Sequence, residues 1–468
     1  MRWPAGTGAV REALAGEQAW IVGGTVRDAL LDRETADLDV AVAGDPETAA
    51  RRVARAIGGP VFALSERFGA WRALDRRRRL MVDVSRLQGD GIEADLLRRD
   101  FGVNAMAVPL AGGEVIDPTG GRADLAARRL RVLGADTYRE DPLRPLRLVR
   151  LAAELDFAPD DETEVLTRAA AARTTGASGE RIWAELRRIM TAPGVVPGLR
   201  LGDRLGVLGA VLPEIAQLRG VEQSKYHHLD VFDHTIEVVE RQIELEVRLA
   251  EVFGPLAARV AAVLDEPLAD ELTRGQALRL GALLHDVAKP ATRGVRPDGR
   301  ITFIGHDSVG DEMIGTICRR LRTSDRLRSF LGALARHHLV LGFLVHRRPL
   351  SRRDVYRYLK HTSPVEVEVT LLSCADRLAT RGAGSEEAID VHLELARELM
   401  SEALEWRAAG PPRPPLRGDE LAAELGIEPG PEVGVLLAQL EEAAYAGEAR
   451  SRAEALELAR RLREGPAR

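Results

Sequence analysis

The hydrophobic pattern of the chain changes near residue 141, and this change limits the possible folds more than any other feature. Before it, short apolar segments alternate with glycine turns, and the segments 19–22, 38–42, 68–74 and 80–84 have the pattern of strands, the last two forming a hairpin. After it, helical periodicity repeats between short Gly and Pro breaks. The sequence therefore predicts an α+β fold: a head with a small β-sheet, followed by an all-helical remainder.

The length and composition predict several globular domains. The 468 residues are 45% hydrophobic and 29% charged, as in folded proteins, and they exceed the usual size of one domain. We expect a head over 1–140, a helical neck over 141–225 and a helical domain over 226–405. A Pro-rich linker over 410–415 then precedes a small helical tail over 416–468.

The charge and the apolar pattern exclude some classes of protein. A net charge of -6 excludes a globally cationic nucleic-acid binder but leaves local basic patches possible. No apolar run approaches the ~20 residues of a membrane span, and no export-type apolar segment follows Met1. The two cysteines cannot build a disulfide framework. We therefore expect a cytoplasmic protein, with no membrane and no permanent protein partner implied.

The basic and imidazole residues are unevenly distributed. Three of the 66 basic residues are lysine, so 63 are arginine, a bias that binds phosphates well but that a GC-rich genome would also produce. All ten histidines lie between His227 and His392. A site that needs imidazole must therefore lie in that stretch, and chemistry in the first 226 residues must use carboxylates and arginines.

A glycine pair separates the first predicted strand from a helix-compatible segment over 26–31. Gly23 and Gly24 let the backbone approach a phosphate, and the amides at a helix start favour anions. Arg27, in the first helical turn, is placed to contact the same phosphates. The alternative is an ordinary turn.

Two carboxylates follow on one predicted strand. Alternate residues of a strand share a face, so Asp37 and Asp39 point the same way. Two carboxylates together with substrate phosphates are what Mg²⁺ uses in phosphoryl transfer. The alternative is a solvated strand face, but the position of the pair soon after the Gly-Gly turn favours the metal. Asp83, on the neighbouring predicted strand, is a weaker candidate for a third carboxylate.

Adjacent arginines form a further candidate group. Arg98 and Arg99 are flanked by Asp95 and Asp100. Such a pattern is typical of a salt-bridged helix surface, and it equally suits the binding of a triphosphate or a ribose.

The predicted neck opens on a capped helix with an arginine stripe. Asp141 precedes Pro142, which predicts an N-cap with proline at the first helical position. Arg144, Arg147 and Arg150 recur every three residues and therefore follow one side of that helix. Beside Asp141, these arginines offer donors and an acceptor to a base edge, so the protein could select a nucleotide without a template.

A second constellation lies in the histidine-bearing stretch. Its members are imidazoles and carboxylates spread over predicted helices, and such ligands suit a divalent ion with open positions for water. The histidine–aspartate dyad at 285–286 would be structural if it stood alone. The members are His234, His285, Asp286, His306, His337, His338 and Asp376.

The order of motifs over about 20–190, and more weakly the tail, resembles the class II nucleotidyltransferases, which comprise CCA-adding tRNA nucleotidyltransferases and bacterial poly(A) polymerases. Several short motifs in one order carry the resemblance. They are Gly23-Gly24-x-Val26-Arg27-Asp28, Asp37-x-Asp39, Arg98-Arg99-Asp100-Phe101-x-x-Asn104, Asp117-Pro118-x-Gly120-Gly121, Glu140-Asp141-x-x-Arg144 and Gly179-Glu180-Arg181-Ile182.

The resemblance implies a polymerase-β-like head and a reaction in which a tRNA 3′-hydroxyl attacks the α-phosphate of CTP or ATP and releases pyrophosphate. It implies that Asp37 and Asp39 are catalytic and hold Mg²⁺. The implied nucleotide-binding residues are Gly23, Gly24, Arg27 and Arg99 for the triphosphate and sugar, and Asp141, Arg144, Arg147 and Arg150 for the base.

Two departures from the family pattern affect the finer activity. Gly102 stands where the family usually has Thr. The stretch 85–94 is short, whereas complete CCA-adding enzymes usually carry a longer flexible loop there, so it resembles the CC-adding subtype. We therefore hypothesise CC addition. Full CCA addition, poly(A) synthesis and a head that binds RNA without transfer remain alternatives.

The histidine-bearing stretch resembles the HD-type metal-dependent phosphohydrolases. By this resemblance the core ligands of a divalent metal of unknown identity are His234, His285, Asp286 and Asp376. His306 and either His337 or His338 would complete a two-metal site. The implied substrates are RNA ends with a 2′,3′-cyclic or 2′-phosphate, and the alternative is a remnant domain that has lost its activity.

Overall fold

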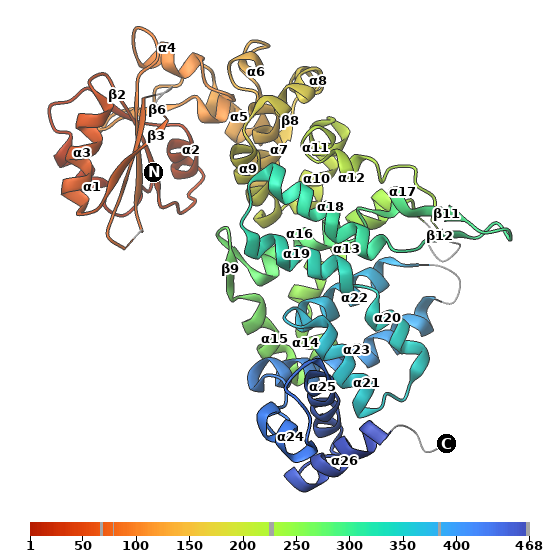
Figure 1. The fold of residues 1–468 in the computed structure, drawn as a ribbon. Helices are drawn as coiled ribbons and strands as arrows, with labels where there is room; N and C mark the ends of the chain where they lie inside the picture. Colours follow the sequence, from red (N-terminus) through yellow and green to blue (C-terminus); the bar gives the residue numbers. More distant parts are fainter. Residues whose placement is uncertain (66–68, 78, 224–228, 382–384, 465–468) are drawn as a thin grey trace. The chain divides into compact units, whose positions relative to one another are not determined.

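The computed structural model describes residues 1–65, 69–77, 79–223, 229–381 and 385–464. The chain forms two compact units, Met1–Val211 and Leu212–Arg468, coloured red to yellow-green and yellow-green to blue in Figure 1. Within the described ranges, every helix is too short or too polar to cross a membrane.

A six-stranded sheet forms the centre of the head, in the order β3-β4-β5-β2-β1-β6. Parallel pairing joins β2 to β5, while the other neighbours are antiparallel. The predicted strands and hairpin are confirmed, although residue 68 lies outside the described ranges. The strands are β1 (Ala19–Val22), β2 (Asp37–Val42), β3 (Val61–Ser65), β4 (Ala70–Leu74), β5 (Met81–Arg86) and β6 (Ala107–Pro109).

Helices pack against this sheet and complete the head. For example, α3 begins where the Asp45 carboxylate accepts a hydrogen bond from the Thr48 amide, and its buried Ala50 and Val53 face β4 and β5. The sheet side of the core includes Leu38 and Val40, both fully buried. The helices are α1 (Thr7–Ala13), α2 (Gly24–Leu30), α3 (Pro46–Ile57), α4 (Ile92–Leu97), η1 (Gly102–Asn104), α5 (Gly121–Ala126) and α6 (Thr137–Glu140).

The neck packs its helices around α7, whose apolar face contacts α9 and α10. A short parallel pair, β7 (Arg129–Leu130) with β8 (Ala158–Pro159), links the neck to the preceding chain. The helices are α7 (Arg144–Leu155), α8 (Asp161–Ala170), η2 (Ala171–Gly176), α9 (Gly179–Thr191), α10 (Val195–Arg204) and α11 (Val207–Val211).

The start of α7 corrects one expectation. The helix begins at Arg144, after Leu143, and the proline in its first turn is Pro145. Asp141 instead caps the preceding turn, because its carboxylate accepts a hydrogen bond from the Leu143 amide at 3.1 Å. Two prolines suit a first helical turn equally well by sequence, and the structure uses the second one.

The second unit is mainly helical, as predicted, although two short antiparallel strand pairs within it depart from the all-helical expectation. Its HD-like part packs α13 against α16 and α22, and α18 against α19. The elements are α12 (Pro213–Ala216), α13 (Val231–Val247), α14 (Leu249–Phe253), η3 (Gly254–Leu256), α15 (Ala257–Leu264), β9 (Pro267–Ala269), β10 (Leu272–Thr273), α16 (Arg274–Leu284), α17 (Lys289–Thr292), β11 (Arg293–Val295), β12 (Ile301–Phe303), α18 (His306–Leu321), α19 (Asp325–His337), α20 (Val340–Leu344), η4 (Val345–Arg347), α21 (Arg352–Thr362), α22 (Glu366–Ala379) and α23 (Ser385–Ala409).

The tail has an apolar core of its own. Leu421, Leu436 and Leu440 are buried there together with Ala443 and Ala455. The helices that contribute these residues are α24 (Gly418–Leu425), α25 (Pro431–Ala446) and α26 (Arg452–Glu464).

Candidate active site

The glycine bend after β1 brings three chemical groups together. Gly23 has φ 66°, a conformation that glycine adopts without strain, and a Cβ there would lie 2.7 Å from Nη1 of Arg99. A Cβ on Gly24 would lie 3.7 Å from Oδ2 of Asp39. The bend, the guanidinium and the carboxylate therefore face a common space, and a side chain at Gly23 would crowd the guanidinium of Arg99.

Strand β2 holds the two predicted catalytic carboxylates on one face. The Thr25 hydroxyl fixes the strand against α2, since it donates to the Asp37 carbonyl at 3.1 Å and accepts from the Asp39 amide at 2.9 Å. Within the described part of the chain, neither carboxylate accepts a hydrogen bond. Two like charges so placed, without donors of their own, fit a divalent cation.

The pKa shifts on this face of β2 also fit a divalent cation. Burial raises the pKa of Asp39 to about 6, and the charges of Asp83 and Asp37 add to the rise, while Arg99 opposes it. Burial and Asp83 also raise the pKa of Asp37. Arg72 holds Asp83 by two contacts of 2.7 Å, so the predicted third carboxylate already has a cationic partner.

We expect Asp39→Asn to flatten the pH dependence of stability of the metal-free protein. The folded pKa of about 6 exceeds the ordinary 3.8, so the wild type loses stability as pH rises through this window. The loss amounts to at most about 3 kcal/mol, and asparagine removes it. Thermal unfolding in EDTA at pH 5 and pH 8 measures the difference. An identical pH dependence in both proteins would contradict this electrostatic picture.

The arginines next to the bend are held by acidic and amide partners. Arg27 is 6% exposed and contacts both oxygens of Asp28 at 2.9 and 2.8 Å, while its Nη1 donates to Oδ1 of Asn104 at 2.7 Å. Arg99 pairs with Asp95, four residues earlier, at 2.9 Å. Arg99 therefore forms the salt bridge that one interpretation of the adjacent arginines predicted. It nevertheless lies beside the glycine bend.

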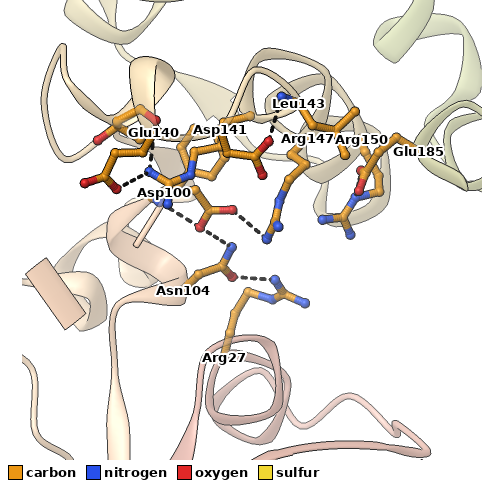
Figure 2. Close-up of polar contacts among 12 residues, drawn as sticks. Arg27, Asp100, Asn104, Glu140, Asp141, Leu143, Arg147, Arg150 and Glu185 are labelled. Carbon is orange, nitrogen blue, oxygen red and sulfur yellow. Dashed lines mark hydrogen bonds and ion pairs between the residues drawn. The ribbon is translucent and has the colours of Figure 1, made fainter. Parts of the chain in front are cut away.

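The neck arginines lie along α7, and each has an intramolecular partner; Arg147 and Arg150 are labelled in Figure 2. Arg144 donates to the carbonyl oxygens of Thr137 and Arg98, each at 2.9 Å. Arg147 forms an ion pair of 2.7 Å with Asp100, which is 4% exposed. These arginines are thus fixed in place before any ligand binds.

The remaining neck contacts come from α7 itself and from α9. Arg150 contacts Glu185 at 2.5 Å and Glu154 at 2.9 Å. Asp141 accepts from Nη2 of Arg181 at 2.7 Å, and this ion pair opposes burial and keeps the pKa of Asp141 below its ordinary value. Asp141 is therefore a carboxylate in its charged, accepting form near neutral pH.

All ten residues predicted for the head and neck line one cavity of about 670 Å³. Among the described residues, nine arginines, nine acidic residues and no aromatic side chain line it, so the cavity suits a strongly polar, charged ligand. Several lining residues were not predicted, among them Glu185 and Arg188. Their spacing from Arg181 places all three on one face of a helix, which is the signal that could have identified them.

In the second unit, the predicted HD residues converge from several helices. His234 lies on α13, Asp376 on α22, and His285 with Asp286 directly after α16. Nε2 of His234 lies 3.0 Å from Asp376, and Nε2 of His285 lies 3.0 Å from Asp286. The candidate ligand atoms fall into two groups, each within 4.8 Å: His234, His285 and Asp376, and His285, Asp286 and His338.

The imidazoles are oriented as metal ligands usually are. Nδ1 contacts a main-chain carbonyl at 2.8 Å in His285, 2.6 Å in His306 and 2.6 Å in His338, which leaves Nε2 facing inward. Asp286 is buried and its Oδ2 forms an ion pair of 2.7 Å with Nζ of Lys289, but neither of its carboxylate oxygens nor Nε2 of His285 makes a well-formed hydrogen bond among the described residues. Such buried polar atoms fit a divalent cation.

One predicted HD ligand lies elsewhere. His338 joins the cluster, with Nε2 3.3 Å from that of His306, whereas the ring of His337 packs against His361 at 4.5 Å. Successive residues at a helix end point about 100° apart, so one of the two neighbours faces the cluster and the other does not. His227 and His228 lie outside the described residues.

Comparisons with known proteins agree with this geometry. Residues 19–131 match the poly A polymerase head domain, 156–218 the probable RNA and SrmB-binding site of polymerase A, and 231–381 the HD domain. A CC-adding tRNA nucleotidyltransferase of Thermus thermophilus is 37% identical over 94% of this chain and 92% of its own. The chain belongs to the tRNA nucleotidyltransferase family. An A-adding tRNA nucleotidyltransferase of Deinococcus radiodurans is 36% identical over 92% of both chains.

Solved structures share the fold of this tRNA nucleotidyltransferase at lower identity. A CCA-adding enzyme in complex with ATP aligns with 96% of this chain and 94% of its own, at 20% identity and a TM-score of 0.63. The Thermotoga maritima CCA-adding enzyme in complex with tRNA aligns with 97% and 94%, at 21% identity and a TM-score of 0.59. The predicted α+β head with a helical remainder and an HD domain is confirmed.

Proposed function

We propose that this tRNA nucleotidyltransferase adds nucleotides from CTP or ATP to the 3′ end of tRNA. One observation carries the proposal: Asp37 and Asp39 face the glycine bend across a cavity that the neck arginines also line. The relatives named for CC or A addition, and the structural neighbours in complex with tRNA and ATP, support the substrate class.

Each residue would bind the part of the nucleotide that lies next to it in the cavity. Gly24 leaves space for the triphosphate, and the cationic side chains of Arg27 and Arg99 offset its charge. Asp37 and Asp39 would hold divalent ions, for which we propose Mg²⁺, and these ions would stabilise the charge that develops during phosphoryl transfer. At the other end of the cavity, the neck arginines and Asp141 offer donors and an acceptor to the base.

For the finer activity we propose CC addition. Residues 87–91 alone connect β5 to α4, so this part of the cavity rim carries no long loop. The first relatives include both CC-adding and A-adding enzymes at nearly equal identity, so overall similarity does not separate the two. The short connection is the observation that favours CC addition.

We expect the purified chain to extend tRNA that lacks its 3′ end by two nucleotides with CTP, and to leave tRNA ending in CC unchanged with ATP. Gel separation of labelled tRNAs ending before C74, after C74 and after C75, each with CTP or ATP alone, measures the outcome. Efficient addition of A to tRNA ending in CC would contradict the subtype. Long A tails on unrelated RNA would instead identify a poly(A) polymerase.

A second activity is favoured by the HD cluster. We propose a metal-dependent phosphohydrolase that acts on RNA ends with a 2′,3′-cyclic or 2′-phosphate. The convergent imidazoles and the buried carboxylate of Asp286 among them support it. The two cysteines, both buried and unpaired, fit a reducing compartment, so we place both activities in the cytoplasm.

A further inference from the structure

A continuous row of polar side chains joins the two ends of the cavity (Figure 2). Arg27, beside the glycine bend, donates through Nη1 to Oδ1 of Asn104 at 2.7 Å. Nδ2 of Asn104 donates to Oδ1 of Asp100 at 3.0 Å, and Oδ2 of Asp100 pairs with Nη2 of Arg147 at 2.7 Å. We call these four residues the relay. Arg27, Asp100 and Asn104 are each at most 6% exposed, so water does not replace these contacts.

The chemistry of the relay determines which residue can stand at its centre. The guanidinium of Arg27 requires an acceptor, and the carboxylate of Asp100 requires a donor, so the amide of Asn104 has one allowed orientation. Burial raises the pKa of Asp100, but Arg147 and Asn104 outweigh it and hold that pKa below its ordinary value. Asp100 is therefore charged near neutral pH, and an aspartate in place of Asn104 would face it with a like charge.

We propose that Asn104 is a positioning residue that couples the triphosphate end of the cavity to its base-reading end. The inference rests on the proposed function, in which one nucleotide contacts Arg27 and the neck together. The ribose fixes the distance between the triphosphate and the base of a nucleotide. The triphosphate-binding end of the cavity and its base-reading end must therefore keep a fixed separation. Asn104 maintains this separation because it bonds to Arg27 directly and to Arg147 through Asp100.

The decisive variant is Asn104→Asp. It has nearly the same shape and keeps an acceptor for Arg27, but it repels Asp100 and so displaces Arg147. We expect kcat/KM for CTP to fall about 100-fold, as for other small misplacements of a positioned substrate. We also expect the preference for CTP over UTP to fall about tenfold, although Asn104 does not touch the neck.

The matched control is the double variant Asn104→Asp with Asp100→Asn. It exchanges the two side chains, keeps the total charge and restores a donor facing an acceptor at each link of the relay, although the Phe101 amide, which donates to Oδ1 of Asp100 at 2.9 Å, loses its acceptor. We expect the CTP preference to recover at least threefold relative to Asn104→Asp alone, as about 0.7 kcal/mol of pairwise coupling would give. A merely structural role of Asn104 would lower activity and melting temperature without changing this preference.

Three results decide the inference. An unchanged CTP-to-UTP preference in Asn104→Asp, or no recovery in the exchanged variant, would overturn it. If Asn104→Asp does not fold, Asn104→Ala replaces it, because alanine loses the contacts to both Arg27 and Asp100. An unchanged CTP-to-UTP preference in Asn104→Ala would then overturn the inference. Calorimetric binding of CTP and UTP to the wild type distinguishes a failure of the proposed function from a failure of the inference about Asn104. A wild-type chain that neither binds nor transfers CTP would overturn the proposed function, and this inference with it.

Discussion

Replacing Asp37 and Asp39 together by alanine is expected to lower CTP incorporation into truncated tRNA by about 10³-fold or more. Asp39 lies beside the glycine bend, Asp37 lies on the same strand and lines the same cavity, and among the described residues neither carboxylate accepts a hydrogen bond. Losing the cations that they would hold removes several kcal/mol of transition-state stabilisation, and each 1.36 kcal/mol is a factor of ten. Single-turnover incorporation of labelled CTP measures the loss.

The control for this prediction lies in the second unit. The Asp37→Ala, Asp39→Ala protein should retain its HD-dependent hydrolysis and its affinity for tRNA, because the HD cluster belongs to a separate compact unit. Retained CTP incorporation in this variant would contradict the catalytic role of Asp37 and Asp39, whereas a wild type that binds tRNA but incorporates no CTP would show that the head binds RNA without catalysing transfer. Loss of hydrolysis as well would indicate global misfolding.

Replacing His285 and Asp286 by alanine is expected to lower phosphohydrolase activity by more than about 100-fold and to remove the bound divalent metal. His285 belongs to both candidate ligand groups, and Asp286 presents a buried carboxylate to the second of them. Release of phosphate from 2′-phosphorylated RNA ends, and opening of 2′,3′-cyclic ends, should be assayed across Mg²⁺, Mn²⁺, Co²⁺ and Ni²⁺. Elemental analysis of the purified protein measures the metal.

His337→Ala is the matched control for the HD cluster. Its imidazole adjoins His338 in sequence but packs against His361, so its removal should leave the metal content unchanged. Equal hydrolysis by the wild type and by the His285→Ala, Asp286→Ala protein with every metal would show that the HD domain is structural. CTP incorporation by both variants should stay near that of the wild type.

The local elements of the head were predictable because their determinants are local. Strands β1 and β2 follow from apolar runs bounded by turns, and the common face of Asp37 and Asp39 follows from the two-residue period of a strand. Gly23 also has a positive φ, which favours glycine whatever packs against the bend. These features do not depend on which distant segments later pack against them.

The contacts that fix the site were not predictable from one sequence. The hydrogen bond between Arg27 and Asn104 joins positions 77 apart in the chain, and the pairing of Arg72 with Asp83 depends on the register of β4 against β5. Asp141 was expected to cap a helix, but it caps a turn. The choice between His337 and His338 depends on where a helix ends relative to its neighbours, which sequence spacing does not determine.

The most direct test of the head site is anomalous diffraction from crystals of the His285→Ala, Asp286→Ala protein soaked with Mn²⁺ and a non-hydrolysable CTP analogue. We expect manganese peaks between Asp37 and Asp39, with the triphosphate against Gly24 and the base toward the neck arginines. A bound analogue whose manganese lies on other residues, or whose triphosphate lies away from the glycine bend, would contradict the assignment of this site to nucleotidyl transfer.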